Sequence, residues 1–330
     1  MKAKLELIIT HWREPWAICE KMFQMLDVQR GMTREECRVT VVQDGEDSGG
    51  LDYAKLMRSY SFVTRVIRIP KSGISAARNA GIDAADAEFV MFCDCDDMFY
   101  TCDSLRTFLD AIAEDRGAHN VIYGRMLIEN RGQAGRWFKS PQDWNMIFVH
   151  AKAWRLDWLR ERELRFVEGL DYSEDSLFIA ESAMELRPGQ IRGIPEPVYM
   201  WCMRDGSCTS DRANDKRNRA HVCKHRILLP RIAQRRRPNE AGPKALRSIC
   251  DAFYDMTGGR ISGEERAELE AKYARELVAP WWGTAQTVDP DEARRIMAAA
   301  REGAVRNGGF KEETVLFREW VNEMMTKAST

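Results

Sequence analysis

Short apolar stretches alternate with amphipathic stretches along the first 130 residues of the chain. The apolar stretches are rich in β-branched residues, as is typical of strands; they cover residues 4–10, 38–43, 65–69 and 88–93. The stretches between them carry helix signals, among them Pro15 at a first turn and Ser72-Gly73 ahead of an apolar face with helical spacing. Strands that alternate with helices form a parallel sheet with helices on its faces. The pattern therefore predicts an α/β fold.

The hydrophobic pattern changes further along the chain. Residues 118–210 are mixed, and strands are predicted near 120–129 and 197–203, with helices near 150–160 and 175–186. From about residue 213 the pattern is helical throughout, and Pro238, Pro280 and two Gly-Gly pairs separate the predicted helices, which cover 213–236, 244–256, 262–277, 289–307 and 312–325. We therefore predict an α/β domain over residues 1–210 and an α-helical domain over residues 211–330.

The two predicted domains carry opposite net charge, although the whole chain has a formal net charge of −1. Residues 1–210 hold 27 Lys and Arg against 33 Asp and Glu, and residues 211–330 hold 23 against 18. Ten of the basic residues lie in the segment 212–237, together with a single acid, Asp215. A charge split of this kind indicates two tasks in one chain.

Composition excludes several classes of protein. Hydrophobic residues make up 44% of the chain and charged residues 31%, which excludes a disordered or fibrous protein. No apolar stretch approaches the ~18 residues of a membrane-spanning helix, and the N-terminus is typical of a strand rather than an export signal. The nine Cys form no CxxC pair, which argues against a zinc ribbon or a disulfide framework. We expect free thiols in a reducing cytoplasm.

The sharpest local feature is the acidic turn Asp94-Cys95-Asp96-Asp97, which directly follows the apolar stretch 88–93. Close carboxylates repel one another unless a cation or solvent relieves the repulsion. At the carboxyl end of a parallel strand they face the crevice where open α/β sheets bind ligands, and carboxylate oxygens select Mg²⁺ or Mn²⁺. The alternative is a solvated turn that caps the next helix. The position after a buried strand favours the metal.

Two further motifs have both a functional and an ordinary interpretation. The stretch Ser72–Gly81 opens a helix whose first N–H groups suit an anion, and Arg78 one turn in can reach a phosphate. Alone, this stretch is a common helix start. Glu174-Asp175 precede an apolar pair, as acids do where they complement a helix dipole. A partly buried acid at that place can instead act as a general base toward a substrate hydroxyl.

Taken together and in this order, the motifs resemble those of family 2 glycosyltransferases. The resemblance rests on VVQDGED (41–47), SGISAARNAGI (72–82), DCDD (94–97), EDSLF (174–178) and IPEPVYMWCMRDGSCTS (194–210). It spans roughly residues 3–210 and implies the GT-A nucleotide-diphospho-sugar transferase fold, a Rossmann-like mixed sheet. No QxxRW motif lies downstream of Glu174-Asp175, which argues against a processive polysaccharide synthase.

The resemblance implies a donor site. Asp44 matches the acid that binds the nucleotide base, usually uracil, and Thr10 and His11 end the first strand beside that base. Arg78 matches a basic residue on the donor side, and Arg204 lies where a cation can face the diphosphate. The first loop reads THWREPW (10–16) instead of the family's usual Tyr-Asn pattern, so the base pocket can differ.

The resemblance also implies metal and catalytic residues. Asp94 matches the acid near the donor ribose. Asp94 and Asp96 are the expected ligands of Mn²⁺ or Mg²⁺. Asp97 is expected to support these ligands without binding the metal itself. Asp175 matches the catalytic base, with Glu174 as its neighbour. The implied reaction is an inverting transfer in which Asp175 takes the acceptor proton and the metal neutralises the departing nucleoside diphosphate. A UDP-sugar is the expected donor, and a hydroxyl of a glycan, a lipid-linked glycan or a protein is the expected acceptor.

The basic segment 212–237 has several interpretations. It can be a solvated face whose apolar group Ile227–Leu229 docks on the catalytic domain. It can also be a surface for a nucleic-acid backbone or a peripheral contact with an anionic membrane. It holds no aromatic residue for base stacking. His221, Cys223 and His225 imitate the spacing of metal ligands, but without a further partner we expect them to be incidental.

The tryptophans are expected in two different places, and two further functions are considered. Trp281-Trp282 is expected in the core of the helical domain, whereas Trp137, Trp144 and Trp154 are expected to line an acceptor site. Two alternative functions stay open. One is glycosyl transfer to hydroxylated bases in DNA, for which the basic segment is the only support. The other is a catalytically silent module that binds a nucleotide sugar or a nucleic acid.

Overall fold

The chain divides into two compact units, Met1–Asp211 and Arg212–Thr330. The computed structural model describes residues 2–46, 52–132, 135–139, 148–170, 172–204, 215–234, 238–257, 263–306 and 317–329. Each unit has a hydrophobic core of its own, and the two units are described separately.

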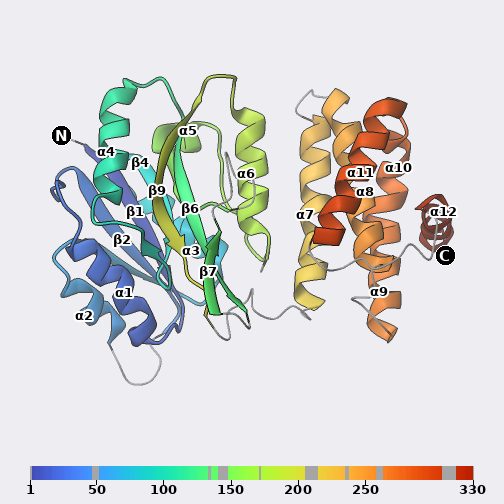
Figure 1. Ribbon diagram of the computed structural model, residues 1–330. Coiled ribbons are helices and arrows are strands. Elements are labelled where there is room, and N and C mark those ends of the chain that lie inside the picture. The colour runs from blue at the N-terminus through green and yellow to red at the C-terminus, as the bar shows by residue number, and fades with distance from the viewer. Residues whose placement is uncertain are drawn as a thin grey trace. The chain divides into compact units, whose positions relative to one another are not determined.

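A mixed sheet forms the centre of the N-terminal unit (Figure 1). Within the described residues it has nine strands, in the order β3-β2-β1-β4-β8-β6-β9-β5, and β7 pairs with β6. Strands β3, β2, β1 and β4 run parallel, whereas β8 is antiparallel to both of its neighbours. These four parallel strands are the ones that the apolar stretches predict, because a sheet buried on both faces needs continuous apolar strands. The strands are β1 (Ala3–His11), β2 (Cys37–Asp44), β3 (Val63–Ile69), β4 (Ala87–Asp94), β5 (Met98–Phe99), β6 (Val121–Gly132), β7 (Gly135–Lys139), β8 (Lys152–Arg155) and β9 (Ile191–Trp201).

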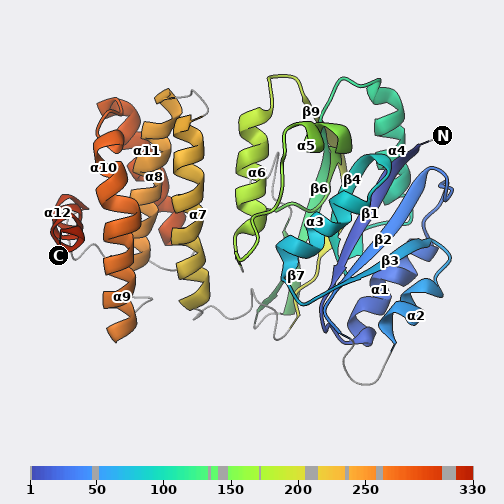
Figure 2. The same cartoon turned by 180° about the vertical axis from the view of Figure 1, so that it is seen from behind.

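Helices cover both faces of the sheet (Figures 1 and 2). Side chains alternate along β1, so that Leu7 and Ile9 face one core and Ile8 faces the other. The first core is closed by α1 (Trp16–Asp27), α2 (Tyr53–Arg58) and α4 (Ser104–Asp115). The second is closed by α3 (Ile74–Ala84), α5 (Leu156–Glu161) and α6 (Glu174–Glu185). The unit is therefore a three-layer α/β/α arrangement that leaves the carboxyl ends of the parallel strands open.

Helix α3 approaches strand β1 closely. A Cβ atom at Gly81 would lie 2.2 Å from Cγ2 of Ile8, so the contact requires glycine. At the other end of the helix, Gly73 has a φ of 95°, which turns the chain from the preceding loop into α3. The close contact and this turn fix where Arg78 enters the unit.

The region after residue 118 departs in part from prediction. The sequence predicts a helix near 150–160, but Lys152–Arg155 forms β8 and the helix begins only at Leu156. Four residues are too few to show a period, and pairing with β4 and β6 decides the outcome. Trp154 is fully buried against Phe178, with ring centroids 5.2 Å apart, so its expected place in an acceptor site is wrong. Trp144 and the side chain of Trp137 lie outside the described residues.

The C-terminal unit is helical, as predicted. Trp281 and Trp282 pack against its core, in agreement with the sequence. Pro238 and Pro280 do not simply interrupt helices, because each lies in the first turn of one, where a missing N–H has no cost. The described elements are α7 (Asp215–Gln234), α8 (Pro238–Thr257), α9 (Gly263–Tyr273), the π-helical turn η1 (Ala274–Val278), α10 (Ala279–Ala285), α11 (Pro290–Arg306) and α12 (Phe317–Ala328).

Helix α7 carries most of the basic segment 212–237, whose residues 212–214 and 235–237 lie outside the described chain. Leu229 is buried in the core of the helical unit itself. His225 is buried and its Nδ1 lies 2.8 Å from the hydroxyl of Ser248, whereas the side chains of His221 and Cys223 are outside the described residues. No helix in the described part of the chain is long and apolar enough to cross a membrane.

Candidate active site

The residues that the sequence assigns to donor, metal and catalysis line one pocket of the N-terminal unit. The pocket has a volume of about 410 Å³, which suits a small ligand. The register of β1 and β4 places Thr10 beside Asp94, so both strands end at the pocket. The assigned residues among its lining are Thr10, His11, Asp44, Arg78, Asp94, Asp96, Glu174, Asp175 and Arg204.

Arg78 links two acids from different parts of the chain. Its Nη1 donates to Oε1 of Glu174 at 2.8 Å, and its Nη2 donates to Oδ1 of Asp94 at 3.1 Å. The guanidinium is buried and lies 5.2 Å from the ring centre of Phe166. Burial opposes its charge, but Asp94 and Glu174 raise the pKa of Arg78 above its ordinary value. Arg78 is therefore a fixed positive charge at the base of the pocket.

Asp94 is held in its ionised form. Thr10 Oγ1 donates to its Oδ1 at 3.3 Å, and His150 Nε2 lies 3.1 Å from its Oδ2. Burial alone would raise the pKa of Asp94, yet the positive charges of His150 and Arg78 lower it well below its usual value. Burial likewise opposes the charge of His150, but Asp94 raises the pKa of the imidazole. The ring of His150 stacks on Tyr199 with centroids 5.3 Å apart.

Asp97 connects the acidic turn to strand β9 and to the residue that follows it. The hydroxyl of Tyr199 donates to its Oδ2 at 2.9 Å, and the N–H of Cys202 donates to its Oδ1 at 2.8 Å. Burial raises the pKa of Asp97 to about 8, against the attraction of His150. A carboxyl with this pKa keeps its proton at neutral pH.

Asp44 joins the end of β2 to the loop before α3. Its Oδ1 accepts the N–H of Ser72 at 2.7 Å, and its Oδ2 accepts the N–H of Gly73 at 3.0 Å and Nζ of Lys71 at 2.5 Å. The N–H groups of Ser72 and Gly73 therefore already bind the carboxylate of Asp44 and are not free for another anion. Lys71 Nζ also lies 3.8 Å from the ring centre of Trp12, an exposed residue at the rim of the pocket.

Arg204 lies between Asp96 and a third acid, Glu14. Its Nε forms an ion pair with Oδ2 of Asp96, and its Nη2 lies 3.4 Å from Oε1 of Glu14. Among the described residues, nothing donates a hydrogen bond to Oδ1 of Asp96. Burial, together with the charge of Asp96, raises the pKa of Glu14. Two carboxylates thus share one cation, Arg204, and Oδ1 of Asp96 is free to bind a ligand.

Glu174 and Asp175 begin helix α6. The N–H of Ser176 donates to Oδ1 of Asp175 at 2.7 Å. Burial, followed by the charge of Asp175, raises the pKa of Glu174 to about 7. Burial also raises the pKa of Asp175, although the charge of Arg78 opposes that shift. A carboxylate of raised pKa that lines a pocket is suited to take a proton from a ligand.

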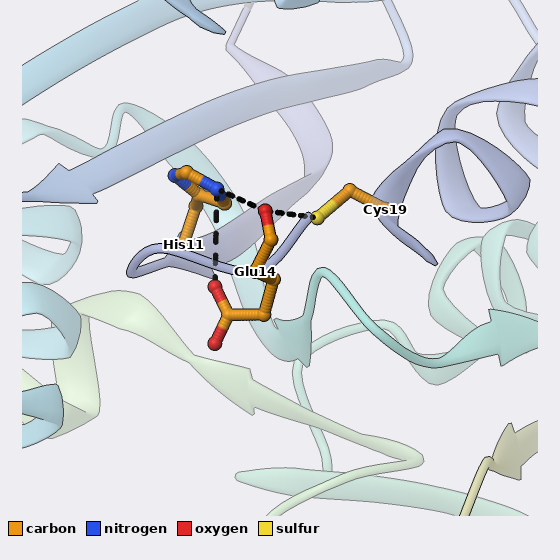
Figure 3. Close-up of side chains that lie close together, drawn as sticks. All are labelled: His11, Glu14 and Cys19. Carbon is orange, nitrogen blue, oxygen red and sulfur yellow. Dashed lines mark hydrogen bonds and ion pairs between the residues drawn. The ribbon is translucent and has the colours of Figure 1, made fainter. Parts of the chain in front are cut away.

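His11 is part of a polar cluster between β1 and α1 (Figure 3). Its Nε2 lies 3.2 Å from the backbone oxygen of Glu14 and 3.9 Å from Oε2 of the same residue, and Cys19 Sγ lies 3.6 Å from that backbone oxygen. Cys19 Sγ is also 3.5 Å from Cys95 Sγ, and this hydrogen bond lowers the pKa of Cys19 to about 7. The ring of His11 stacks on Tyr53 with centroids 4.7 Å apart.

The donor atoms around the acidic turn suit a hard cation. The ligand atoms of Asp94, Asp97 and His150 lie within 4.8 Å of one another. Asp96, an expected ligand, is not in this group, while Asp97 already accepts two hydrogen bonds. Asp96 lines the pocket instead, and its Oδ1 accepts no hydrogen bond from a described residue. Carboxylate oxygens at a pocket surface are the donors that Mg²⁺ and Mn²⁺ prefer.

Sequence reasoning did not find Glu14 and His150. Glu14 precedes Pro15 at a helix start, so an acid at the entrance to the first helix was the available signal. His150 is one of only five His in the chain and precedes a short strand. Its contact with Asp94 depends on the pairing of β8 with β4, which no local pattern encodes.

Comparisons with known proteins bear on the family and the fold of the chain. Residues 7–162, most of the N-terminal unit, match the family model described as glycosyl transferase family 2. The fold is similar to that of S. aureus TarS 1–349, with a TM-score of 0.61 and 16% identity over 91% of this chain and 92% of that one. For TarS 1–349 in complex with UDP-GlcNAc, the TM-score is 0.55 and the identity 18% over the same shares. No curated protein matches the chain by sequence.

The mixed sheet and the two helical layers define the GT-A fold. The match of the N-terminal unit to the model of glycosyl transferase family 2 identifies the chain as a glycosyltransferase.

Proposed function

We propose that this enzyme transfers a sugar from a nucleoside-diphosphate donor to an acceptor hydroxyl, with inversion at the anomeric carbon and with Mn²⁺ or Mg²⁺ as cofactor. A UDP-sugar is the proposed donor, which the complex of TarS 1–349 with UDP-GlcNAc supports. The proposed acceptor is a glycan, a lipid-linked glycan or a protein. The observation that carries the proposal is that Asp175, Arg78 and the acidic turn line one pocket.

Asp175 is the proposed base. It removes the proton of the acceptor hydroxyl while that oxygen forms a bond to the anomeric carbon of the donor. The bond between this carbon and the diphosphate oxygen breaks, and its electron pair leaves with the nucleoside diphosphate. Attack from the face opposite the leaving group inverts the anomeric centre. The raised pKa of Asp175 suits this proton transfer near neutral pH.

Positive charge and aromatic surface complete the pocket. Arg204 lines it beside Asp96 and offers a cation to the diphosphate. Asp94 and Asp96 are the proposed metal ligands, and a bound divalent ion neutralises negative charge on the leaving diphosphate. Phe148, Tyr172 and Trp201 line the same pocket and offer the aromatic surface that the buried Trp154 cannot. Such rings present large apolar faces to a sugar.

The variant Asp175→Asn tests the proposal. We expect it to bind UDP with Mn²⁺ as the wild type does, measured by calorimetry, and to lose at least ~100-fold in UDP release, the size of a typical general-base effect. Asp157→Asn is the matched control, because Asp157 is an exposed acid of the same unit outside the pocket. Full UDP release by Asp175→Asn would overturn the role of Asp175.

The donor is tested on the wild type. Thermal shifts with UDP, GDP, dTDP and CMP in the presence of Mn²⁺ should be largest for UDP. Nucleotide release is then measured with the matching sugar donors and panels of glycan, lipid-linked and protein acceptors. If the wild type binds a nucleotide but releases no nucleoside diphosphate with any combination of donor and acceptor, the protein would be a binding module. The proposed transfer would then be wrong.

A further inference from the structure

Two thiols, an imidazole and a carboxylate converge where strand β1 enters helix α1. His11 ends β1, Glu14 lies in the loop that follows, and Cys19 lies in the first turns of α1. Cys95 belongs to the turn after β4. Figure 3 shows His11, Glu14 and Cys19 pointing toward one another. Glycosyl transfer gives no task to the two thiols.

Several distances between these groups are close to those around a tetrahedral ion. With Zn–S bonds of about 2.3 Å and Zn–N or Zn–O bonds of about 2.0–2.2 Å, the ligand atoms of a tetrahedron stand roughly 3.3–3.8 Å apart. Cys19 Sγ and Cys95 Sγ are 3.5 Å apart, and Cys95 Sγ and Glu14 Oε2 are 3.4 Å apart. His11 Nε2 is 3.9 Å from Glu14 Oε2, and the ligand atoms of His11, Glu14 and Cys19 all lie within 4.8 Å of one another. Cys95 is not in that group, so its side chain has to move toward His11 for all four atoms to bind one ion.

Burial and charge suit a closed site for a soft or borderline ion. Cys19, Cys95 and His11 are each at most 3% exposed, and Glu14 is 13% exposed. Thiolates favour zinc over the hard ions Mg²⁺ and Mn²⁺. Two thiolates and a carboxylate around Zn²⁺ leave one negative charge, and Arg204 lies 3.4 Å from Oε1 of Glu14 to offset it. Four protein ligands with no open position are the pattern of a structural zinc site.

We propose that His11 Nε2, Glu14 Oε2, Cys19 Sγ and Cys95 Sγ bind a structural Zn²⁺ ion, separate from the Mn²⁺ or Mg²⁺ proposed for catalysis. The ion ties the loop of residues 12–15 and the start of α1 to the acidic turn, so it fixes one wall of the pocket against the other. This proposal does not rest on the proposed glycosyl transfer. Its ligands and its metal can be detected without any substrate.

Cobalt titration of the full chain tests the ligands. Co²⁺ replaces Zn²⁺ in tetrahedral sites, and thiolate ligands give it a charge-transfer band in the near ultraviolet. Protein stripped with a chelator should take up one Co²⁺ with this band, and one equivalent of Zn²⁺ should abolish it while excess Mg²⁺ should not. Cys19→Ala and Cys95→Ala should each weaken Co²⁺ binding at least ~10-fold. Cys37→Ala is the matched control, because Cys37 is equally buried in the same unit but outside the cluster.

A second measurement needs no variant and therefore stands if an alanine variant fails to fold. X-ray absorption at the zinc edge of the wild type, loaded with one equivalent of Zn²⁺, should show two sulfur ligands at about 2.3 Å and two nitrogen or oxygen ligands at about 2.0–2.2 Å. A shell without sulfur, or no thiolate band with Co²⁺, would overturn the proposal. Mass spectrometry under non-reducing conditions gives a third check. A protein two hydrogens lighter, with Cys19 linked to Cys95, would also overturn the proposal, because these two residues would then form a disulfide.

Discussion

Arg78 and Glu174 are 96 positions apart in the chain, yet Nη1 of one lies 2.8 Å from Oε1 of the other. The ion pair joins α3 to the start of α6, and the second guanidinium nitrogen binds Asp94 at the end of β4. One buried cation thus holds the donor side of the pocket, the acidic turn and the proposed catalytic base in one arrangement.

Removal of this cation should destabilise the enzyme. Arg78→Met leaves two partly buried carboxylates without their buried partner, which costs up to ~3–5 kcal/mol of the free energy of unfolding. Arg78→Lys keeps the charge but cannot bind both acids in a planar fork, so it should lose less stability and still lower activity. Urea unfolding measures both variants. Arg162→Met is the control, because Arg162 is half exposed and its ion pair with Glu185 is worth at most ~1 kcal/mol. Equal losses at the two sites would contradict the assigned role of Arg78.

Metal removal should abolish sugar transfer. A chelator is expected to stop the release of the nucleoside diphosphate, and Mn²⁺ or Mg²⁺ should restore it. Asp96→Asn replaces one carboxylate oxygen by an amide nitrogen that cannot bind the ion, so the metal concentration for half activity should rise at least ~10-fold. Asp103→Asn is the control, since Asp103 is an exposed acid at the start of α4. An unchanged metal requirement in Asp96→Asn would exclude Asp96 as a ligand.

Asp97 should make the stability of the chain depend on pH. Burial raises the pKa of this carboxyl from 3.8 to about 8, so the folded chain binds a proton that the unfolded chain has lost. Its contribution to stability is complete below about pH 4 and is lost as the pH rises through about 8. Asp97→Asn mimics the protonated form. Without added metal, the stability of this variant relative to the wild type should therefore increase between these pH values, by up to ~1.4 kcal/mol per pH unit. A relative stability that stays constant or decreases would show that Asp97 is ionised in the folded chain.

The contact between α3 and β1 should tolerate no side chain at Gly81. Gly81→Ala places a Cβ 2.2 Å from Cγ2 of Ile8, and such overpacking costs ~1–3 kcal/mol of the free energy of unfolding. Gly283→Ala is the matched helical control, because nothing lies within 4 Å of its added Cβ. That variant should be unchanged or up to ~1 kcal/mol more stable, since alanine favours helices. Chemical denaturation measures both, and an unimpaired Gly81→Ala would show that α3 can move away from the sheet.

Strands β1, β2 and β4 could be predicted from sequence because burial on both faces leaves continuous apolar stretches. The edge strand β3 is largely exposed and was predicted from its β-branched residues instead. Strand β8 could not be predicted, since its four residues include Lys152 and Arg155 and gain their structure from β4 and β6. The helices of the C-terminal unit were recognised from helical spacing, but prolines at positions 238 and 280 start helices there instead of ending them.

The site shows the same division between local and distant causes. Asp94, Arg78 and Asp175 stand in motifs with a fixed order, so a resemblance to a family was enough to single them out. The contact of Asp44 with the N–H groups of Ser72 and Gly73 depends on how a loop folds back on a strand end. No spacing along the chain encodes that contact.

The pairing of Thr10 with Asp94 across β1 and β4 restricts how this enzyme can change its specificity. A slip of one residue in either strand would exchange the two faces of that strand and turn its apolar side chains away from their core. Deletions and insertions in these strands should therefore be lethal to the fold. Directed evolution toward a new nucleotide is best confined to Trp12, Arg13 and Lys71, which border the pocket outside the strands. The rigid frame and the variable rim are thus separable targets for engineering.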